Sequence, residues 1–290
     1  MPARILDGRA LAAELRADLQ AEATALREIG IAPRLLVAMV GEDDSSLAYV
    51  RGMKALGAKV GIEVEVDVLR EDVTDAEVRD ALKRYGADPA VHGIILQQPL
   101  PKHLSIRAIA SAMPEEKDVD GASPVNQGRL AFATGARFIP ATPAAVMLLL
   151  ERSAAWPLAG RDVTVIGRSN VVGLPVSLLL MAQNATVTVT HKDTIDIKHH
   201  VRDAEIVVVA AGAPHLVDAS WLRPGAVVID VGTTVVDGKL LGDVDFESAA
   251  TVASEITPVP GGVGPVTNVA LMRNVLAAAR ATAAPEFSSS

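Results

Sequence analysis

The stretch DVTVIGRSNVVGLP, residues 162–175, decides the fold. Its first five residues read as an apolar strand and Leu174–Gln183 as a helix, so a turn with two glycines joins them. Gly167 permits a tight turn, and Gly173 permits close approach of a helix or ligand. The N-terminus of such a helix offers N–H groups to a phosphate. The spacing is G-x5-G and not the usual dinucleotide pattern G-x-G-x-x-G, so an ordinary strand–helix turn is an open alternative.

The alternation of strand and helix continues after this turn. We expect strands at residues 186–189, 206–210 and 227–231, a weak helix around 195–203, and a hairpin or loop at 232–242. Right-handed crossovers between such strands produce a doubly wound parallel sheet, so the pattern predicts a Rossmann-type domain.

The first part of the chain also alternates, in the order αβαβαβ. The expected elements are a helix at 9–29, a strand at 35–40, a helix from Ser45 or Ser46 to Lys59, a strand at 62–68, a helix from Thr74 to Tyr85 and a strand at 93–97. Residues 98–143 are rich in proline and glycine, with short elements only at 106–112 and 128–132.

These patterns predict an α/β fold with two three-layer α/β domains. A helix capped by Thr142 and running to about Arg152 would link them, and residues 267–282 would form the last helix. We assign residues 1–140 plus 268–290 to the first domain and 141–267 to the Rossmann domain.

Composition narrows the class of protein. The 290 residues are 50% hydrophobic and only 3% aromatic, which suits a buried parallel sheet built from Val, Ile, Leu and Ala. The absence of cysteine excludes disulfides and thiolate metal sites, and we expect no metal. A net charge of −8 argues against a nucleic-acid partner. No signal-like or membrane-length apolar run occurs, so we expect a cytoplasmic protein without a membrane partner.

Two cationic positions bear on the choice of cofactor. Arg168 lies in the glycine turn, and His191-Lys192 follows the next strand, where NAD-binding proteins often place an acid for the ribose. Cations at these positions suit the 2′-phosphate of NADP, although Asp193 follows directly. The competing interpretation is that Arg168 and Lys192 are solvated surface charges.

A second glycine-rich stretch is TPVPGGVGPVT, residues 257–267. Its glycines and prolines fix an unusual backbone path with free N–H groups, which could meet a nicotinamide or a phosphate. A rigid connector between domains is an equally good interpretation of this stretch.

Three more stretches are unremarkable when taken one at a time: SLAYVRGMK (46–54), LQQPLP (96–101) and PEEKDVDG (114–121). Together with NQGRL (126–130) and the two glycine stretches, they resemble the bacterial methylenetetrahydrofolate dehydrogenase/methenyltetrahydrofolate cyclohydrolase (FolD) family. The resemblance runs in the same order from residue 6 to about 280.

The resemblance implies roles for particular residues and an active cleft between the two domains. Tyr49 would lie against the pterin, Gln97 would face the reacting carbon, and Asp120 would accept hydrogen bonds from the pterin ring nitrogens. Other substrate-binding residues would be Pro99, Gly262, Gly264 and Thr267. NADP would be bound by Gly167, Arg168, Ser169, Gly173, His191, Lys192 and Thr233. Tetrahydrofolate derivatives would be the ligands, and the protein would be a homodimer.

One departure from the family pattern concerns chemistry. The family has a catalytic Lys four residues after the Tyr, whereas this chain has Met53 there and Lys54 one place later. Positions four apart share a helix face, so Met53 lies roughly 40° from Tyr49 around the helix axis and Lys54 roughly 140°. Only a local π-bulge would restore the lysine. Ala122-Ser123 and Ala141 also depart from the common pattern.

The resemblance implies an NADP-dependent methylenetetrahydrofolate dehydrogenase, and the departure at Met53 predicts weak or absent cyclohydrolase activity, because hydride transfer needs no strict general base whereas hydrolysis must move protons. Three alternatives are open. They are the full bifunctional activity, with Lys54 or water replacing the lost group; a non-catalytic folate- and NADP-binding regulatory protein; and an unrelated amino-acid dehydrogenase of similar architecture.

Overall fold

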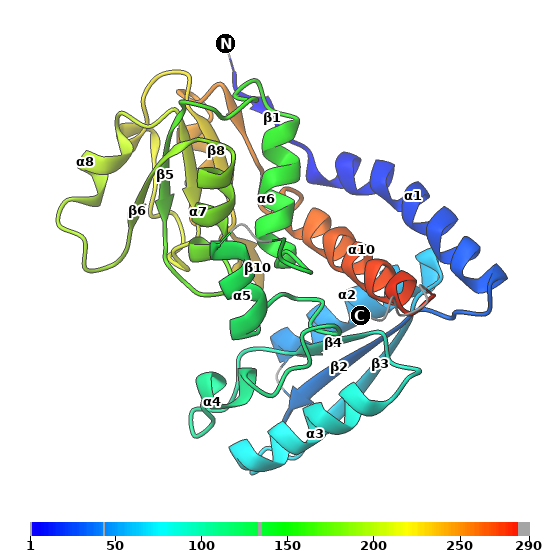
Figure 1. Ribbon diagram of the computed structural model, residues 1–290. Helices are drawn as coiled ribbons and strands as arrows, with labels where there is room; N and C mark the ends of the chain where they lie inside the picture. The colour runs from blue at the N-terminus through cyan, green and yellow to red at the C-terminus, as the bar shows by residue number, and fades with distance from the viewer. Residues whose placement is uncertain (1, 43, 133–134, 284–290) are drawn as a thin grey trace. The chain divides into compact units, whose positions relative to one another are not determined.

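The computed structural model describes residues 2–42, 44–132 and 135–283 (Figure 1). Internal contacts divide the chain into two compact units. We call residues 1–13 with 142–267 the six-stranded unit, and residues 14–141 with 268–290 the three-stranded unit. The last part of the predicted first domain, residues 284–290, lies outside the described residues.

The six-stranded unit is built on one parallel sheet with the strand order β1-β11-β8-β7-β5-β6. Its strands are β1 (Arg4–Ile5), β5 (Asp162–Ile166), β6 (Thr186–Thr190), β7 (Ile206–Val209), β8 (Val227–Asp230) and β11 (Glu255–Ile256). The chain leaves β5 to form β6 on one side, then returns across β5 to form β7 and β8 on the other. This reversal makes the sheet doubly wound, as predicted, and sets a topological switch point between β5 and β7.

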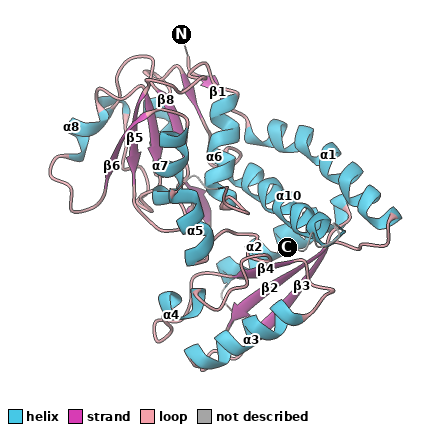
Figure 2. Ribbon diagram, viewed as in Figure 1, coloured by secondary structure: helices cyan, strands magenta, loops and turns pink. Residues whose placement is uncertain are grey.

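Burial of the central strands explains why they are so apolar. Every residue of β7 and β8 is buried, which a parallel sheet covered on both faces requires. Helices flank the sheet in Figure 2, and α7 packs on β5 and β6. The remaining elements are α6 (Ala141–Glu151), α7 (Gly173–Ala182), α8 (Ile197–Val201), the 3-10 helix at Ala219–Trp221, the hairpin β9 (Thr234–Val236) and β10 (Lys239–Leu241), and α9 (Phe246–Ala249).

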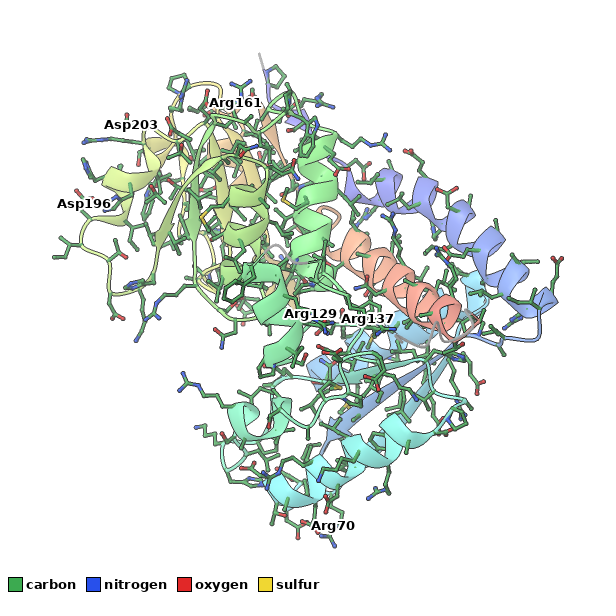
Figure 3. The ribbon with its side chains drawn as sticks, viewed as in Figure 1. Arg70, Arg129, Arg137, Arg161, Asp196 and Asp203 are labelled. Atoms are coloured by element: carbon green, nitrogen blue, oxygen red, sulfur yellow. The ribbon has the colours of Figure 1, made fainter. Side chains whose placement is uncertain are left out.

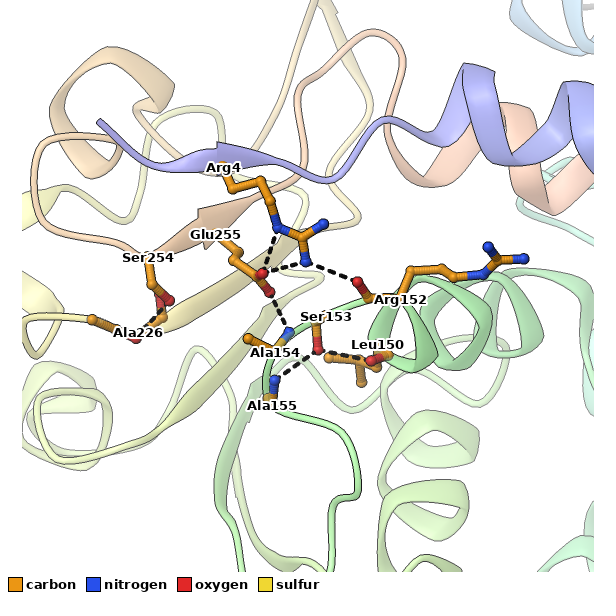
Figure 4. A network of polar contacts seen from close by, with 10 residues as sticks. Arg4, Leu150, Arg152, Ser153, Ala154, Ala155, Ala226, Ser254 and Glu255 are labelled. Atoms are coloured by element: carbon orange, nitrogen blue, oxygen red, sulfur yellow. Dashed lines mark hydrogen bonds and ion pairs between the residues drawn. The ribbon is translucent and has the colours of Figure 1, made fainter. Parts of the chain in front are cut away.

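The first residues of the chain belong to this unit, so the predicted assignment of residues 1–13 to the first domain is wrong. The reason is that β1 pairs with β11 and extends the six-stranded sheet. Figure 4 shows how a buried carboxylate secures the pairing: Glu255 accepts hydrogen bonds from the Arg4 side chain and, at 2.9 Å, from the Ala154 N–H. Arg4 also donates to the Arg152 carbonyl at 2.8 Å.

The three-stranded unit has a parallel sheet with the order β3-β2-β4. Its elements are β2 (Arg34–Val40), α2 (Asp44–Val60), β3 (Glu63–Leu69), α3 (Asp75–Ala87), β4 (Gly93–Leu96), α4 (Ile106–Ala110) and α5 (Pro124–Ala131). Two long helices, α1 (Gly8–Glu28) and α10 (Val263–Ala283), contribute most of their residues to this unit.

Local sequence rules account for these elements. Leu36, Ala38 and Val40 of β2 point to one face and join a core with α3, and the residues between them are also buried, so both faces of β2 are covered. The edge strand β3 is only half-buried, as its alternating sequence predicts. Thr74 caps α3 in a capping box with Glu77, whose N–H donates to the Thr74 hydroxyl at 3.3 Å.

Several predicted boundaries shift. Helix α6 begins at Ala141, so Thr142 lies in its first turn and not at the cap. Helix α2 begins at Asp44, ahead of both candidate serine caps. Helix α5 spans Pro124–Ala131, and α10 begins at Val263, inside the glycine–proline stretch predicted to be irregular. The hairpin expected at 232–242 has its turn at Asp237-Gly238, where both residues have positive φ. Within the described ranges, no helix is long and apolar enough to cross a membrane.

Candidate functional site

The glycine turn after β5 is fixed by backbone sterics. Gly167 has φ of +115°, and an added Cβ would lie 2.1 Å from the carbonyl oxygen of Ala210. A Cβ on Gly173 would lie 2.0 Å from the carbonyl oxygen of Gly167. Neither position has room for a side chain, so both glycines are required by the path of the chain.

The helix that follows this turn suits an anion. Helix α7 begins after Val172, and no side chain caps it. Ser169 closes the turn from within, because its carbonyl accepts from the Leu174 N–H at 3.1 Å and its hydroxyl from the Val172 N–H at 3.2 Å. The uncapped N-terminus lies at the topological switch point, where doubly wound sheets bind their ligands. These features fit the pyrophosphate of a dinucleotide.

The cations predicted for the 2′-phosphate are on adjacent strand ends. The Gly167 N–H donates to the carbonyl of Thr190 at 2.8 Å, which joins the glycine turn to the end of β6. Arg168 is exposed on one side of this junction, and His191 and Lys192 follow on the other. The carboxylate of Asp193 lies 4.0 Å from Lys192 Nζ and partly offsets its charge.

After His191 and Lys192 a short loop leads to helix α8. Asp196, labelled in Figure 3, precedes α8 with a positive φ, and its carboxylate accepts from the His199 N–H at 3.2 Å. The side chain of Lys192 is 90% exposed, so it is available to a ligand at this edge.

The glycine–proline stretch borders a cavity of about 140 Å³ in the six-stranded unit. Thr233, Gly262 and Gly264 line it, as do two residues that the sequence analysis missed, Arg9 and Asp230. The cavity wall depends on a close backbone approach, because a Cβ on Gly8 would lie 1.7 Å from the Gly262 carbonyl oxygen. Burial raises the pKa of Asp230 to about 6 although three backbone N–H groups donate to it.

Thr267 is not part of that lining. Its hydroxyl donates to the carbonyl of Val263 at 3.2 Å, one turn back along α10, and lies 3.5 Å from the Thr142 hydroxyl. The residue is buried, so in this unit its visible role is to hold the first turn of α10.

In the three-stranded unit, a buried carboxylate organises the loop after β4. Asp118 accepts from the N–H groups of Ala122 at 3.0 Å and Ser123 at 2.8 Å, and from Asn126 Nδ2 at 2.8 Å. Ser123 in turn caps α5. Burial outweighs these hydrogen bonds and raises the pKa of Asp118. The KDVDG motif therefore has one structural carboxylate, Asp118, which the sequence analysis did not separate from Asp120.

The Asp120 carboxyl and the Tyr49 phenol both have raised pKa values. Burial, with a smaller contribution from the negative charge of Asp118, raises the pKa of Asp120 to about 7. The Ala141 N–H donates to Asp120 and opposes this shift. Although 38% of Tyr49 is exposed, partial burial and the charge of Asp120 raise the pKa of its phenol. At neutral pH the phenol is therefore neutral and Asp120 is poised to exchange a proton.

The predicted residues around β4 are only partly brought together. A small, mainly apolar cavity is lined by Asp118 and Asp120 and by Gln98. Gln97 follows β4 and its Nε2 donates to the Gln98 carbonyl at 2.7 Å, while Pro99 is exposed; neither lines this cavity.

Met53 and Lys54 occupy opposite environments on α2. Residues 44–60 are continuous α-helix, so no π-bulge shifts the register. Met53 is fully buried and Lys54 is exposed. The helix therefore presents a thioether one turn after Tyr49, and the ammonium group of Lys54 lies in solvent.

The fold and these sites define a class of protein: a two-unit α/β protein whose doubly wound unit has a glycine turn that fits a dinucleotide and whose other unit carries Tyr49 and Asp120. Family comparisons make this specific. A model of the tetrahydrofolate dehydrogenase/cyclohydrolase catalytic domain matches residues 6–120, and one of its NAD(P)-binding domain matches residues 140–283. The chain belongs to this family, which confirms the resemblance.

Individual relatives are similar to this protein over nearly the whole chain. It is 46% identical to the bifunctional protein FolD of Moorella thermoacetica over 97% of this chain and all of that protein. A FolD crystal structure from Campylobacter jejuni superposes with a TM-score of 0.93 at 37% identity, covering 97% of this chain and 99% of that one. A Trypanosoma brucei FolD complexed with NADP and inhibitor gives 0.93 at 39% identity, covering 98% and 100%.

Proposed function

We propose that this protein oxidises 5,10-methylenetetrahydrofolate to 5,10-methenyltetrahydrofolate with NADP, and that it has weak or no methenyltetrahydrofolate cyclohydrolase activity. One observation supports the second half of this proposal. A fully buried Met53 occupies the family's lysine position, while the neighbouring Lys54 is exposed on an unbroken helix.

The dehydrogenase reaction tolerates this replacement. When bound, NADP would supply the acceptor for a hydride from the methylene carbon, and the folate nitrogens would stabilise the resulting cation. The protein's task is orientation and exclusion of water, which needs no proton carrier at residue 53. In this proposal Tyr49 and Gln97 orient the folate, and the Asp120 carboxylate accepts hydrogen bonds from the pterin ring.

The cyclohydrolase reaction is more demanding. Water adds to the methenyl bridge, a proton leaves that water, and a ring nitrogen must be protonated before the bridge opens. A side chain that titrates near neutral pH speeds such transfers, and a thioether cannot carry a proton. Asp120 is the group with a pKa near neutrality in this region, but in the proposed role its carboxylate is engaged by the pterin.

NADP is favoured over NAD by charge at the end of β6. Arg168, His191 and Lys192 are placed on adjacent strand ends, and Ser169 adds a hydroxyl to the turn. This arrangement suits a 2′-phosphate, which would be repelled by the acid that NAD-binding sites use. The NADP complex of the Trypanosoma brucei relative is consistent with the assignment. By analogy with the family we also infer a cytoplasmic homodimer that acts on tetrahydrofolate derivatives.

The test measures both activities in the full-length protein and in Met53→Lys. Wild-type protein should form NADPH from methylenetetrahydrofolate, while the methenyl absorbance decays at the buffer rate. Met53→Lys should raise the decay rate to at least about tenfold above the buffer rate, which is less than the roughly 100-fold or more that a well-positioned proton carrier contributes. Met181→Lys is the matched control, since Met181 is exposed on α7.

Two results would overturn parts of the proposal. Rapid enzyme-dependent decay in wild-type protein would show that the cyclohydrolase survives. No NADPH formation, with folate and NADP both bound, would identify a binding protein and not an enzyme. If Met53→Lys fails to fold, Met53→Gln keeps the side chain near its original size, and its decay rate should stay at the buffer level because an amide does not titrate.

A further inference from the structure

Two buried carboxylates at the carboxyl edge of the six-stranded sheet have no part in the function proposed above. Asp230 is the last residue of β8, and Asp243 lies between the hairpin and α9. Asp230 is 3% exposed and Asp243 is fully buried. Buried carboxylates are costly unless hydrogen-bonded, so their partners indicate what they are for.

Asp243 holds the turn that follows β7. Its Oδ2 accepts from the N–H of Ala211 at 2.7 Å and from the N–H of Gly212 at 2.8 Å. The same turn begins at Ala210, whose carbonyl oxygen leaves no room for a Cβ on Gly167. Because β5 and β7 flank the topological switch point, the Ala211–Gly212 turn and the glycine turn lie on its two sides, and in the proposed function they are the two walls of the dinucleotide site.

Asp230 in turn fixes Asp243. Its Oδ1 accepts from the N–H of Gly232 at 2.9 Å and of Asp243 at 3.0 Å, and its Oδ2 from the N–H of Val244 at 3.0 Å. The Asp230 N–H donates to Thr257 Oγ1 at 2.7 Å, at the start of the glycine–proline stretch.

Two glycines make room for these carboxylates. A Cβ on Gly232 would lie 2.5 Å from Asp243 Oδ1, and one on Gly242 would lie 1.9 Å from Asp230 Oδ2. The two carboxylates thus connect the loops after β7 and β8 to the segment that follows the hairpin, and the Asp230 N–H adds a bond to the glycine–proline stretch.

The direction of the dinucleotide follows from the sheet order. In doubly wound domains the strand after the glycine turn carries the adenosine ribose, which here is β6, so the β7–β8 side takes the other half. We propose that Asp243 is a positioning residue for the nicotinamide half of the cofactor, acting by holding the Ala211–Gly212 wall in its binding conformation. This inference rests on the proposed function, because it assumes that the crevice binds NADP.

The experiment compares two ligands by calorimetry on the full-length protein: oxidised NADP, and 2′,5′-ADP, which represents only the adenosine half. Asp243→Asn keeps one acceptor oxygen but loses the charge, and Asp243→Ala leaves two N–H groups without an acceptor. NADP affinity should fall in the order Asp, Asn, Ala, by at least about tenfold for Ala, while 2′,5′-ADP affinity stays within about twofold. Asp218→Asn is the matched control, since that carboxylate caps the 3-10 helix at Ala219–Trp221.

Binding of the fragment 2′,5′-ADP distinguishes a positioning role of Asp243 from general damage to the cofactor site. Equal weakening of NADP and 2′,5′-ADP, or unchanged NADP binding in both variants, would refute the positioning role. If Asp243→Ala does not fold, Asp243→Asn alone carries the same comparison. Wild-type protein that binds neither ligand would refute the proposed function and the positioning role with it, whereas normal wild-type binding with unaltered variants would refute the positioning role alone.

Discussion

The two units build their candidate sites from different materials. In the six-stranded unit, Gly167 and Gly173 have no room for a side chain, and the buried Asp243 accepts hydrogen bonds from backbone N–H groups. The candidate site there is therefore made mostly of main-chain atoms. In the three-stranded unit, the site consists of side-chain functional groups, Tyr49 and Asp120, on one helix and one loop.

This difference determines how each site responds to substitution. A site made of backbone is lost only when the path of the chain changes, and the fold itself resists such changes. A site made of side chains can lose one chemical function through a single replacement that packs well. In the proposed function Met53 is such a replacement, because an apolar side chain fits a buried helix position without disturbing α2.

The largest expected effect comes from placing a side chain into the backbone site. Gly167→Ala forces a Cβ to within 2.1 Å of the Ala210 carbonyl at a φ of +115°, so the turn must move. NADP affinity should fall by about 100-fold, because the clash is with backbone that cannot rotate away and the strain is on the order of 3 kcal/mol. Calorimetric titration with NADP measures this loss.

The matched control is Gly128→Ala in α5, where an added Cβ meets nothing within 4 Å. This variant should bind NADP normally. Tetrahydrofolate affinity should survive in Gly167→Ala if the damage is local to the six-stranded unit. Normal NADP binding by Gly167→Ala would show that the glycine turn is not the dinucleotide site.

The main-chain site also explains which features could be read from sequence. The strand–turn–helix at residues 162–175 is local, and periodicity with two glycines predicted β5, the turn and α7 closely. Strands β1 and β11 are two residues each and are paired across 251 positions, so no local pattern signals them. The misassignment of residues 1–13 follows from that missed pairing.

The buried acids were missed for a related reason. Asp230 and Asp243 are single charges beside apolar runs, and only the folded chain shows that each accepts from the backbone of distant loops. The environments of Met53 and Lys54, in contrast, follow from helix geometry alone, since the 100° step per residue separates them.

An intermediate effect is expected from a substitution in the side-chain site. The affected quantity is the free energy of unfolding and not a ligand affinity. The pKa of Asp120 is about 7 in the fold against 3.8 for an ordinary aspartate, so ionisation opposes folding. Wild-type stability should therefore fall as pH rises from about 4 to about 7, while Asp120→Asn does not lose this contribution. The variant should match wild type near pH 4 and exceed it by about 2 kcal/mol at pH 8, after a reduction for partial solvent access.

Denaturant unfolding followed by circular dichroism at several pH values measures this difference. Asp80→Asn, at an exposed position of α3, is the control for the loss of one surface carboxylate. If Asp120→Asn were less stable than wild type at pH 8, the Asp120 carboxylate would have to be ion-paired or well solvated in the fold. Its pKa would then not be raised by burial.

The smallest effect tests whether the side-chain site has an unnoticed substitute for its missing lysine. Lys54 is exposed on a regular helix and points away from the face that carries Tyr49 and Met53. Lys54→Ala should change both the rate of NADPH formation and the decay of the methenyl absorbance by less than about twofold, since isolated surface substitutions seldom exceed 0.5 kcal/mol. A loss of either activity beyond that would mean that the ammonium group reaches the folate after all. The contrast between a rigid main-chain site and a side-chain site changed by one residue would then no longer hold, because the second site would have recovered its function from the next position along the helix.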